Sequence, residues 1–341
     1  MATVLITGAS GVVGRAAAKL FDEEHTIGLV GTVHDVPEVD ETIAIDLRAP
    51  RLGLADADWR SLAERVDYVV HSGALTTWGQ PAELYRSVNI DGTRSVVELA
   101  TAAGAPVVYV GTCFVHAIER GGWDHLGLEN VVAPYIWSKL QAEAILAESG
   151  LPCTVLRPTN LVGDARTGAS SRPQIVQALS DWICRGKAQL VPVHPGNRID
   201  IVSLDVMAEA VVRTVRRECF GRMLWLTYGD RAMTVERSLD LLVEHAARIG
   251  RTIARPPVVD CRELTEAAID AVPSTSKSFV KVLRDVSEAT HWCGGVLPDS
   301  VADLKDLLDI ELPSDEVAFT RSLQYWAAER GQLVSQSAEG A

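Results

Sequence analysis

The sequence has few features of a disulfide-stabilised, metal-binding or membrane protein. Its 341 residues contain six scattered cysteines, with no CxxC pair and no cysteine–histidine spacing of the zinc type. This pattern favours reduced thiols over a disulfide framework or a metal site. No apolar run reaches membrane-spanning length, and the chain does not start with a basic stretch followed by an apolar signal region. We therefore expect a cytoplasmic protein with no membrane partner and no bound metal.

Positive charge is also scarce. The chain has 32 Lys and Arg against 45 Asp and Glu, a formal net charge of −13, and no basic run. This balance argues against a nucleic-acid partner, although small anionic ligands remain open because local groups bind them. What is present is ordinary for a globular protein: 47% hydrophobic and 23% charged residues. The length is enough for one large or two modest domains with a full core.

The first residues carry the strongest pattern in the chain. An uncharged apolar stretch, residues 1–7, runs into a glycine-rich turn, residues 8–14, and then into a helix-forming stretch, residues 15–21. In a strand–turn–helix unit, the first glycine allows the tight turn, the second lets the backbone approach a pyrophosphate, and the third lets helix and strand pack closely. The helix start then binds the pyrophosphate. The predicted contacts are Gly8, Ser10, Gly11, Val12, Val13 and Gly14.

Strands alternate with helices over the first half of the chain. Five further strands are expected, at residues 26–30, 42–45, 67–71, 106–110 and 151–157, and a long helix at 83–103. This rhythm predicts right-handed crossovers and an α/β fold of the Rossmann type, with a doubly wound parallel sheet.

The alternation breaks down after residue 163. Helical stretches at 174–185, 204–216 and 235–249 are separated by short strands at 189–193, 200–202 and 223–227. We predict a Rossmann domain over 1–163 with interleaved segments from about 189–228. A smaller, mainly helical substrate-binding lobe should occupy 164–330, and 331–341 should be a flexible tail.

The end of the second strand bears on the choice of cofactor. NAD-selective sites usually place an acid there to bind the ribose 2′-OH, but this chain has Gly31 followed by Thr32. Arg15 could instead approach a 2′-phosphate, with Thr32 and His34 as lesser candidates, so the pattern favours NADP(H). Asp46 and Leu47 follow the third strand and are placed to meet the adenine.

Small and polar residues follow two more strands. Ser72, Gly73 and Ala74 would let a cofactor lie against the fourth strand, after a His71 that we expect to be packed rather than ligand-binding. Thr112 stands just beyond the fifth strand, where ligands bind in open α/β sheets.

Tyr135 and Lys139 fall on the first turns of a helix that starts near Pro134. Residues spaced by four share one helix face, so the phenol and the ammonium can point into the same cleft. With the glycine turn and Thr112, the pair predicts a catalytic site.

Together these residues resemble the extended short-chain dehydrogenase/reductase family. The matching positions are Thr7–Gly14, Asp46-Leu47, His71–Ala74, Asn89, Gly92-Thr93, Thr112, Tyr135, Lys139 and Leu156–Pro158. The resemblance implies that Tyr135 is the general acid, that Lys139 binds the nicotinamide ribose and favours ionised Tyr135, and that Thr112 binds the carbonyl oxygen. It also implies an Asn89 that supports a proton relay through water. Pro158, Thr159 and Asn160 would lie by the nicotinamide.

Within that family the chain is most similar to the thioester reductase and fatty acyl reductase branch. The similarity rests on the stretches 110–115, 135–143 and 160–168. It implies hydride transfer from NADPH to an acyl thioester, giving an aldehyde or an alcohol. The substrate could be a small molecule or be held on coenzyme A or a carrier protein, whose pantetheine phosphate would meet Arg166, Arg172 or Arg198.

Other functions remain open at this stage. A ketone or aldehyde reductase of the extended family shares most of the same residues. A nucleotide-sugar epimerase or dehydratase uses the same fold, although such enzymes commonly hold NAD, and a silent NADP sensor would not need Thr112, Tyr135 and Lys139 intact. The sequence does not decide the oligomeric state, and a homodimer remains open.

Overall fold

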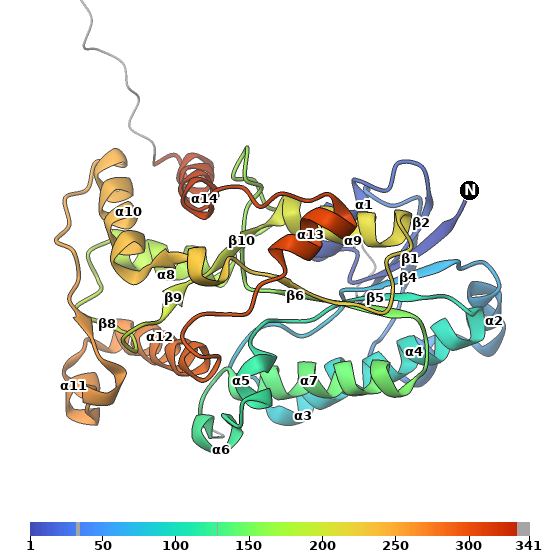
Figure 1. Ribbon diagram of the computed structural model, residues 1–341, viewed down its shortest axis with the longest axis horizontal. Helices are drawn as coiled ribbons and strands as arrows, with labels where there is room; N and C mark the ends of the chain where they lie inside the picture. The colour runs from blue at the N-terminus through green and yellow to red at the C-terminus, as the bar shows by residue number, and fades with distance from the viewer. Residues whose placement is uncertain (32–34, 128, 333–341) are drawn as a thin grey trace, which may run out of the picture.

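A parallel sheet forms the centre of the protein (Figure 1). The structure is a computed structural model that describes residues 1–31, 35–127 and 129–332. Within these residues, seven strands pair in parallel in the order β11-β6-β5-β4-β1-β2-β3. The strands are β1 (Thr3–Thr7), β2 (His25–Val30), β3 (Glu41–Ala44), β4 (Tyr68–His71), β5 (Val107–Val110), β6 (Cys153–Pro158) and β11 (Met223–Leu226). The predicted Rossmann-type doubly wound sheet is confirmed.

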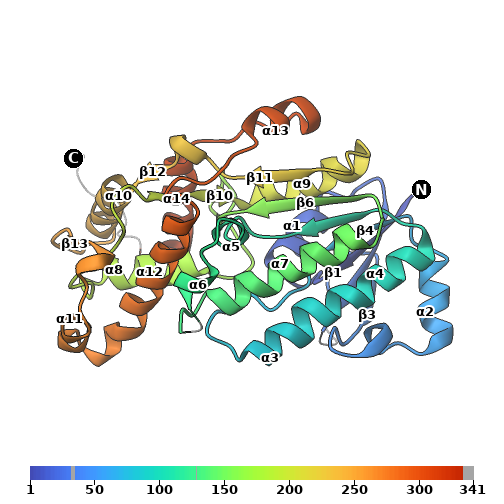
Figure 2. The ribbon, with the colours of Figure 1, turned by 60° about the horizontal axis from the view of Figure 1, so that its bottom comes forward.

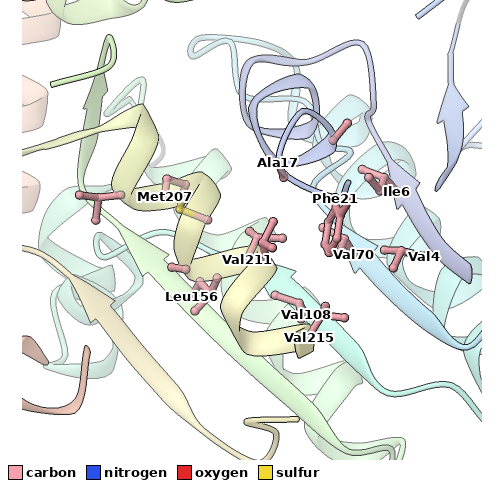
Figure 3. Close-up of a cluster of buried hydrophobic side chains, with 14 of the residues drawn as sticks. Val4, Ile6, Ala17, Phe21, Val70, Val108, Leu156, Met207, Val211 and Val215 are labelled. Carbon is pink, nitrogen blue, oxygen red and sulfur yellow. The ribbon is translucent and has the colours of Figure 1, made fainter. Parts of the chain in front are cut away.

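Helices cover both faces of the sheet because successive strand residues point to opposite sides. Val4 and Ile6 of β1 lie in one buried cluster with residues of α1 (Val12–Ala18) and α9 (Leu204–Arg216), as Figure 3 shows. Leu5 lies in the cluster on the other face. That face is covered by α2 (Asp56–Ala63), α4 (Gly92–Ala103) and α7 (Ala133–Glu148).

The helix expected over residues 83–103 is not uniform. It consists of α3 (Ala82–Tyr85), a π-helical segment η2 (Arg86–Asp91) and α4. Asn89 lies inside η2, where the wider turn changes the direction of the side chains. Single π-helical turns occur often at functional sites, and periodicity alone does not reveal them.

The C-terminal lobe lies beyond the carboxyl ends of the sheet strands (Figure 2). It is mainly helical, as predicted, and its core includes Trp182, whose ring stacks on Phe279 with centroids 5.3 Å apart. Its helices are α8 (Ile175–Cys184), α10 (Val235–Arg248), α11 (Glu266–Ala271), α12 (Ser274–Trp292) and α14 (Asp315–Glu329). Its short strand pairs are β8 (Val191–Pro192) with β13 (Val258–Val259) and β9 (Arg198–Ile199) with β12 (Met233–Thr234).

Two segments differ from the predicted division at 164–330. Strands β8 and β9 belong to the predicted interleaved segment, but they pair with other strands of the lobe. The chain returns to the sheet half at β10 (Ile201–Ser203), which pairs with β7 (Asn160–Val162). In the other direction, α13 (Val301–Leu308) leaves the lobe and packs on α9 and β11. Leu304 and Leu308 are buried in the sheet core, which explains why α13 belongs to that half.

The remaining short helices are α5 (Val115–Glu119), α6 (Trp123–Leu126), η1 (Pro50–Gly53), η3 (Gly229–Arg231) and η4 (Cys261–Glu263). In the described part of the chain, no helix combines the length and the apolar character needed to cross a membrane. The predicted tail lies outside the described residues, apart from residues 331 and 332.

Candidate active site

A cleft with a volume of about 1060 Å³ crosses the carboxyl ends of the parallel strands and continues into the C-terminal lobe. It brings together most of the predicted site residues. Those that line it are Gly8, Ser10, Gly11, Val12, Val13, Gly14, Leu47, Ser72, Gly73, Ala74, Thr112, Tyr135, Lys139, Pro158, Thr159 and Asn160. Arg15, Asp46 and Asn89 are not among its lining residues, and Thr32 and His34 lie outside the described residues.

Backbone atoms of neighbouring residues pack closely against the glycine turn. Gly8 has a φ of +67°, and a Cβ there would lie 2.7 Å from the Cα of Gly73. A Cβ on Gly14 would collide with the carbonyl oxygen of Gly8 and lie 2.9 Å from the Cα of Ala9. No side chain fits at these positions. The N–H groups of Gly8 and Ala9 donate to the Leu29 carbonyl and that of Gly11 to the Gly8 carbonyl, so the donors left for a ligand are those at the start of α1. This cradle fits a pyrophosphate.

At the predicted ribose end of the cradle, the described residues leave space. A Cβ built on Gly31, which lines the cleft after β2, would meet no described atom within 4 Å. Arg15, the predicted 2′-phosphate contact, lies beside Glu38 instead, with Nε 3.7 Å from a carboxylate oxygen. Lys19 approaches the same carboxylate at 3.8 Å. A cofactor phosphate would therefore have to compete with Glu38 for Arg15.

Asp46 does not line the cleft. Its carboxylate accepts hydrogen bonds from the backbone N–H and the Nε of Arg48, both at 2.9 Å. These bonds lower the pKa of Asp46. The neighbouring Ile45 and Leu47 line the cleft, so the adenine region is apolar where this segment forms it.

Thr112, Tyr135 and Lys139 meet in the middle of the cleft and are almost fully buried. Burial raises the pKa of Tyr135, and a hydrogen bond with Thr112 opposes that rise. Burial lowers the pKa of Lys139 to about 7, opposed by the charge of Glu143. The Lys139 Nζ donates to the carbonyl of Val110 at 2.7 Å and lies 4.2 Å from the centre of the Tyr109 ring.

A buried ion network lies behind Lys139. Arg157, only 1% exposed, donates to Glu143 at 2.5 Å and to Glu119 at 2.6 Å, and its guanidinium stacks over the Trp225 ring at 4.7 Å. Sequence reasoning gave these acids no role. The spacing of Glu143, four residues after Lys139 on the same helix face, is the signal that could have found it. Its negative charge keeps the Lys139 pKa from falling further.

Asn89 is fully engaged within the protein. Its Oδ1 accepts from the backbone N–H of Leu75 at 2.7 Å, and its Nδ2 donates to the Leu75 carbonyl and to Ser138 Oγ. Ser138 in turn donates to the carbonyl of Tyr135 at 2.7 Å. Asn89 thus ties the loop after β4 to the helix turn that carries Tyr135. The proton relay expected at this position stays a prediction.

His71 is a packed, neutral residue, as expected, and burial lowers its pKa to about 3. Its Nδ1 lies 2.7 Å from Thr7 Oγ1 and its Nε2 lies 3.0 Å from Thr93 Oγ1. Thr7 Oγ1 also accepts from the Gly73 N–H, and Thr93 donates to the Asn89 carbonyl. The hydrogen bonds through Thr7, His71 and Thr93 therefore all point the same way, from the glycine cradle to the π-helical segment.

The end of the cleft in the C-terminal lobe lies between α8 and α12. Ile175, Ala178, Phe279 and Val282 supply apolar wall, and the cations Arg172, Arg185 and Lys187 line it as well. Arg172 is the only one of the three predicted phosphate-binding arginines found here. Arg166 lines a separate, smaller pocket, and Arg198 donates to the carbonyl of Ala232 at 3.2 Å.

Two other predicted side chains bind backbone rather than facing the cleft with free polar atoms. Thr159 Oγ1 and Asn160 Nδ2 donate to the carbonyl of Asp200 at 2.8 and 3.3 Å. Over residues 1–31, 35–127 and 129–332, no three His, Cys, Asp or Glu side chains are grouped as metal ligands.

The comparisons with known proteins agree with this geometry. Residues 19–211 match the model of an NAD-binding family described as male sterility protein. A linear gramicidin synthase of Brevibacillus parabrevis is 30% identical over 180 residues, covering 49% of this chain and 4% of the synthase. Glycine betaine reductase ATRR of Emericella nidulans is 30% identical over 184 residues, covering 50% of this chain and 14% of that protein. The chain thus spans only a small part of these relatives.

Solved structures share the fold. The terminal R domain from the myxalamid PKS-NRPS biosynthetic pathway has a TM-score of 0.73 at 23% identity, covering 99% of this chain and 93% of that one. A thiolation-reductase di-domain from an archaeal non-ribosomal peptide synthetase has a TM-score of 0.71 at 18% identity, covering 97% and 76%. The Bordetella bronchiseptica enzyme WbmH in complex with NAD+ has a TM-score of 0.66 at 19% identity, covering 96% and 99%.

The family match covers more than half of the chain. Membership of this NAD-binding family indicates a nicotinamide dinucleotide cofactor. The chain belongs to the NAD-binding family described as male sterility protein, within the extended short-chain dehydrogenase/reductases.

Proposed function

We propose that the protein is an NADPH-dependent reductase of acyl thioesters, giving an aldehyde or an alcohol. The observation that carries the proposal is the position of Thr112, Tyr135 and Lys139. They lie where the glycine cradle meets a partly apolar channel between α8 and α12. The relatives include a gramicidin synthase, and a terminal R domain and a thiolation-reductase di-domain share the fold, which supports a thioester on a carrier protein.

The side chains in the middle of the cleft suit carbonyl reduction. The hydroxyls of Thr112 and Tyr135 would donate to the carbonyl oxygen and stabilise the negative charge that develops on it. Because burial raises the pKa of Tyr135, its phenol keeps its proton at neutral pH and can act as a general acid. The Lys139 ammonium, held by the Val110 carbonyl, would orient the ribose. A bound nicotinamide would supply the hydride.

NADPH is the proposed cofactor because the ribose end of the cradle carries no acid at Gly31. An acid at that position would repel a 2′-phosphate, whereas a Cβ on Gly31 would meet no described atom within 4 Å. The six cysteines are all free thiols, which supports the proposed location in a reducing cytoplasm.

The test offers the purified protein NADPH together with an acyl-coenzyme A, an acyl carrier protein, and a ketone and an aldehyde of matched chain length. NADPH loss is followed by absorbance and thiol release by a thiol reagent. We expect NADPH loss with thiol release on the thioesters, and neither in the Tyr135→Phe variant. Ketone reduction without any thiol release would instead assign an ordinary carbonyl reductase. Purified protein that retains NAD and oxidises no NADPH would favour an epimerase or dehydratase.

A further inference from the structure

The channel between α8 and α12 ends in a pair of cations. One face of α8 and the loop after it line the channel through Ile175, Ala178, Trp182, Arg185 and Lys187. From Ile175 to Arg185 the helix rises about 15 Å, at 1.5 Å per residue. The face is apolar at its first turns and basic at its end.

The contacts of the two helices show which end points outward. At the start of α8, Gln177 donates to Ser322 Oγ, which also accepts from the N–H of Gly163, just after β7. At the end of α8, Trp182 Nε1 donates to Ser276 Oγ at 3.0 Å, near the start of α12. The first turns of α8 therefore lie towards the sheet.

Helix α12, which forms the other wall of the channel, runs in the opposite direction to α8. Asp285, in the second half of α12, accepts from the N–H of Val131, just before the helix that carries Tyr135. Ser276, at the start of α12, donates to the carbonyl of Lys187 at 3.3 Å. Arg185 and Lys187 thus stand at the end of the channel away from the reacting centre.

These two cations are not neutralised by the described part of the protein. Both residues are exposed, and no carboxylate of the described residues lies within 4 Å of either one. The acid that lines the same end, Asp181, is paired with Arg330. In a chain with a net charge of −13, a cleft end with two such cations and a neutralised acid is an arrangement that attracts an anion.

We propose that Arg185 and Lys187 bind the phosphate of a phosphopantetheine arm whose thioester reaches Thr112 and Tyr135. The inference rests on the proposed function and adds the group that holds the substrate at its far end. A phosphate suits a planar guanidinium beside a flexible ammonium. The arm separates its phosphate from its sulfur by an extended chain, and the orientation of α8 places these cations at the end of the channel away from the sheet. Thr275 offers a further hydroxyl at the same end.

The test compares two substrates that differ only in the phosphate: an S-acyl-4′-phosphopantetheine and the matching S-acyl-pantetheine. In Arg185→Ala/Lys187→Ala, KM for the phosphorylated substrate should rise roughly ten- to a hundredfold, the loss expected for charge-assisted hydrogen bonds. KM for the unphosphorylated substrate and kcat for both should stay unchanged. Arg60→Ala/Arg222→Ala is the matched control, since it removes two exposed arginines that do not line the cleft.

Direct binding separates this inference from the proposed function. Calorimetry with 4′-phosphopantetheine and with pantetheine needs no turnover. The phosphorylated ligand should bind more tightly, and the double variant should remove that advantage. An equal affinity for the two ligands, or an advantage that survives in the double variant, would overturn the phosphate site even if thioesters are reduced. If the double variant loses the tighter binding of the phosphorylated ligand but the wild-type protein reduces no thioester, the phosphate site is supported and the proposed reductase activity is wrong.

The source of the arm is distinguished by two further substrates, an acyl-coenzyme A and an acyl carrier protein with the same acyl group. Both carry the phosphopantetheine phosphate, so KM for both should rise in Arg185→Ala/Lys187→Ala. In the wild-type protein, a lower KM for the carrier-bound substrate identifies a carrier protein as the source, and a lower KM for the free thioester identifies coenzyme A. If KM rises for neither substrate in the double variant, the proposal is wrong.

Discussion

The two ends of the cleft are built in different ways. At the cofactor end the wall is backbone: a Cβ on Gly8 would lie 2.7 Å from the Cα of Gly73, and a Cβ on Gly14 would collide with the Gly8 carbonyl. At the substrate end the wall is side chain, from α8 and α12, which are separated in the sequence by α9, α10 and α11. A backbone wall accepts one ligand shape, whereas a side-chain wall can be changed by substitution without rebuilding the fold. The cofactor end therefore sets the class of reaction, and the substrate end sets what is reduced.

The largest effect on activity is expected at Tyr135, where the cofactor end and the substrate end of the cleft meet. Tyr135→Phe removes the phenol proton and should lower kcat about a hundred- to ten-thousandfold, the usual contribution of general acid catalysis. The affinity for NADPH, measured by fluorescence titration, should change less than twofold because the cofactor cradle is untouched. Thr112→Ser is the control that keeps a hydroxyl, and it should retain most of the activity. Tyr135→Phe with near-normal turnover would remove the phenol from the chemistry.

Next comes a test of the backbone wall. Gly14→Ala should weaken cofactor binding at least tenfold because its Cβ would collide with the Gly8 carbonyl. Alanine is favoured over glycine in a helix by only about 0.5–1 kcal/mol, too little to offset a clash with backbone. Gly31→Ala makes the same chemical change in the same cleft, but at a position with no described atom within 4 Å. Equal cofactor affinities in the two variants would contradict the contrast between the two kinds of wall.

A third prediction concerns pH. The pKa of Lys139 is lowered from its usual value of 10.5 to about 7, so above pH 7 the free protein holds this amine neutral. The anionic cofactor favours the ammonium form, and binding must then take up a proton. NADPH affinity should therefore fall as the pH rises from 7 to 9, by up to about tenfold per pH unit. Calorimetry in buffers of different ionisation enthalpy measures the proton uptake, and Lys139→Met should abolish it. A flat affinity profile in the wild-type protein would exclude the linkage.

The smallest effect is expected at Gly31, where the described residues leave space at the cofactor end. Gly31→Asp should weaken NADPH binding and strengthen NADH binding, shifting the preference by roughly ten- to thirtyfold through repulsion of the 2′-phosphate and a new bond to the 2′-OH. The ratio of the two dissociation constants measures the shift, with Gly31→Ala as the control for size. If the wild-type protein already prefers NADH, the assignment of NADPH is wrong.

The same contrast explains how much the sequence could predict. The glycine turn, Thr112, Tyr135 and Lys139 stand at fixed offsets from strand and helix ends, so a local pattern places them, and the structure does bring them into one cleft. Arg185 and Lys187 have no such offset, because their position depends on contacts of α8 with α12. Arg166 lines a separate pocket and Arg198 donates to the Ala232 carbonyl.

Local sequence patterns also did not predict the structure where a helix is irregular or where the geometry depends on a single side-chain contact. The π-helical turn at Asn89 leaves no trace in hydrophobic periodicity. The contact between Arg15 and Glu38 joins a helix to a later loop whose course the sequence does not fix. The same holds for α13, whose apolar residues could have packed on either half.

The path of the chain has a consequence for motion. It passes between the sheet half and the lobe after β7, between β9 and α9, between β11 and α10, before α13, and again before α14 (Figure 1). A hinge formed by one or two connections lets domains rotate freely, but here every connection would have to bend at once. Large opening of the two halves is therefore unfavourable. We expect a substrate arm to thread into the cleft from its outer mouth, with rearrangement confined to side chains and the loops that carry them.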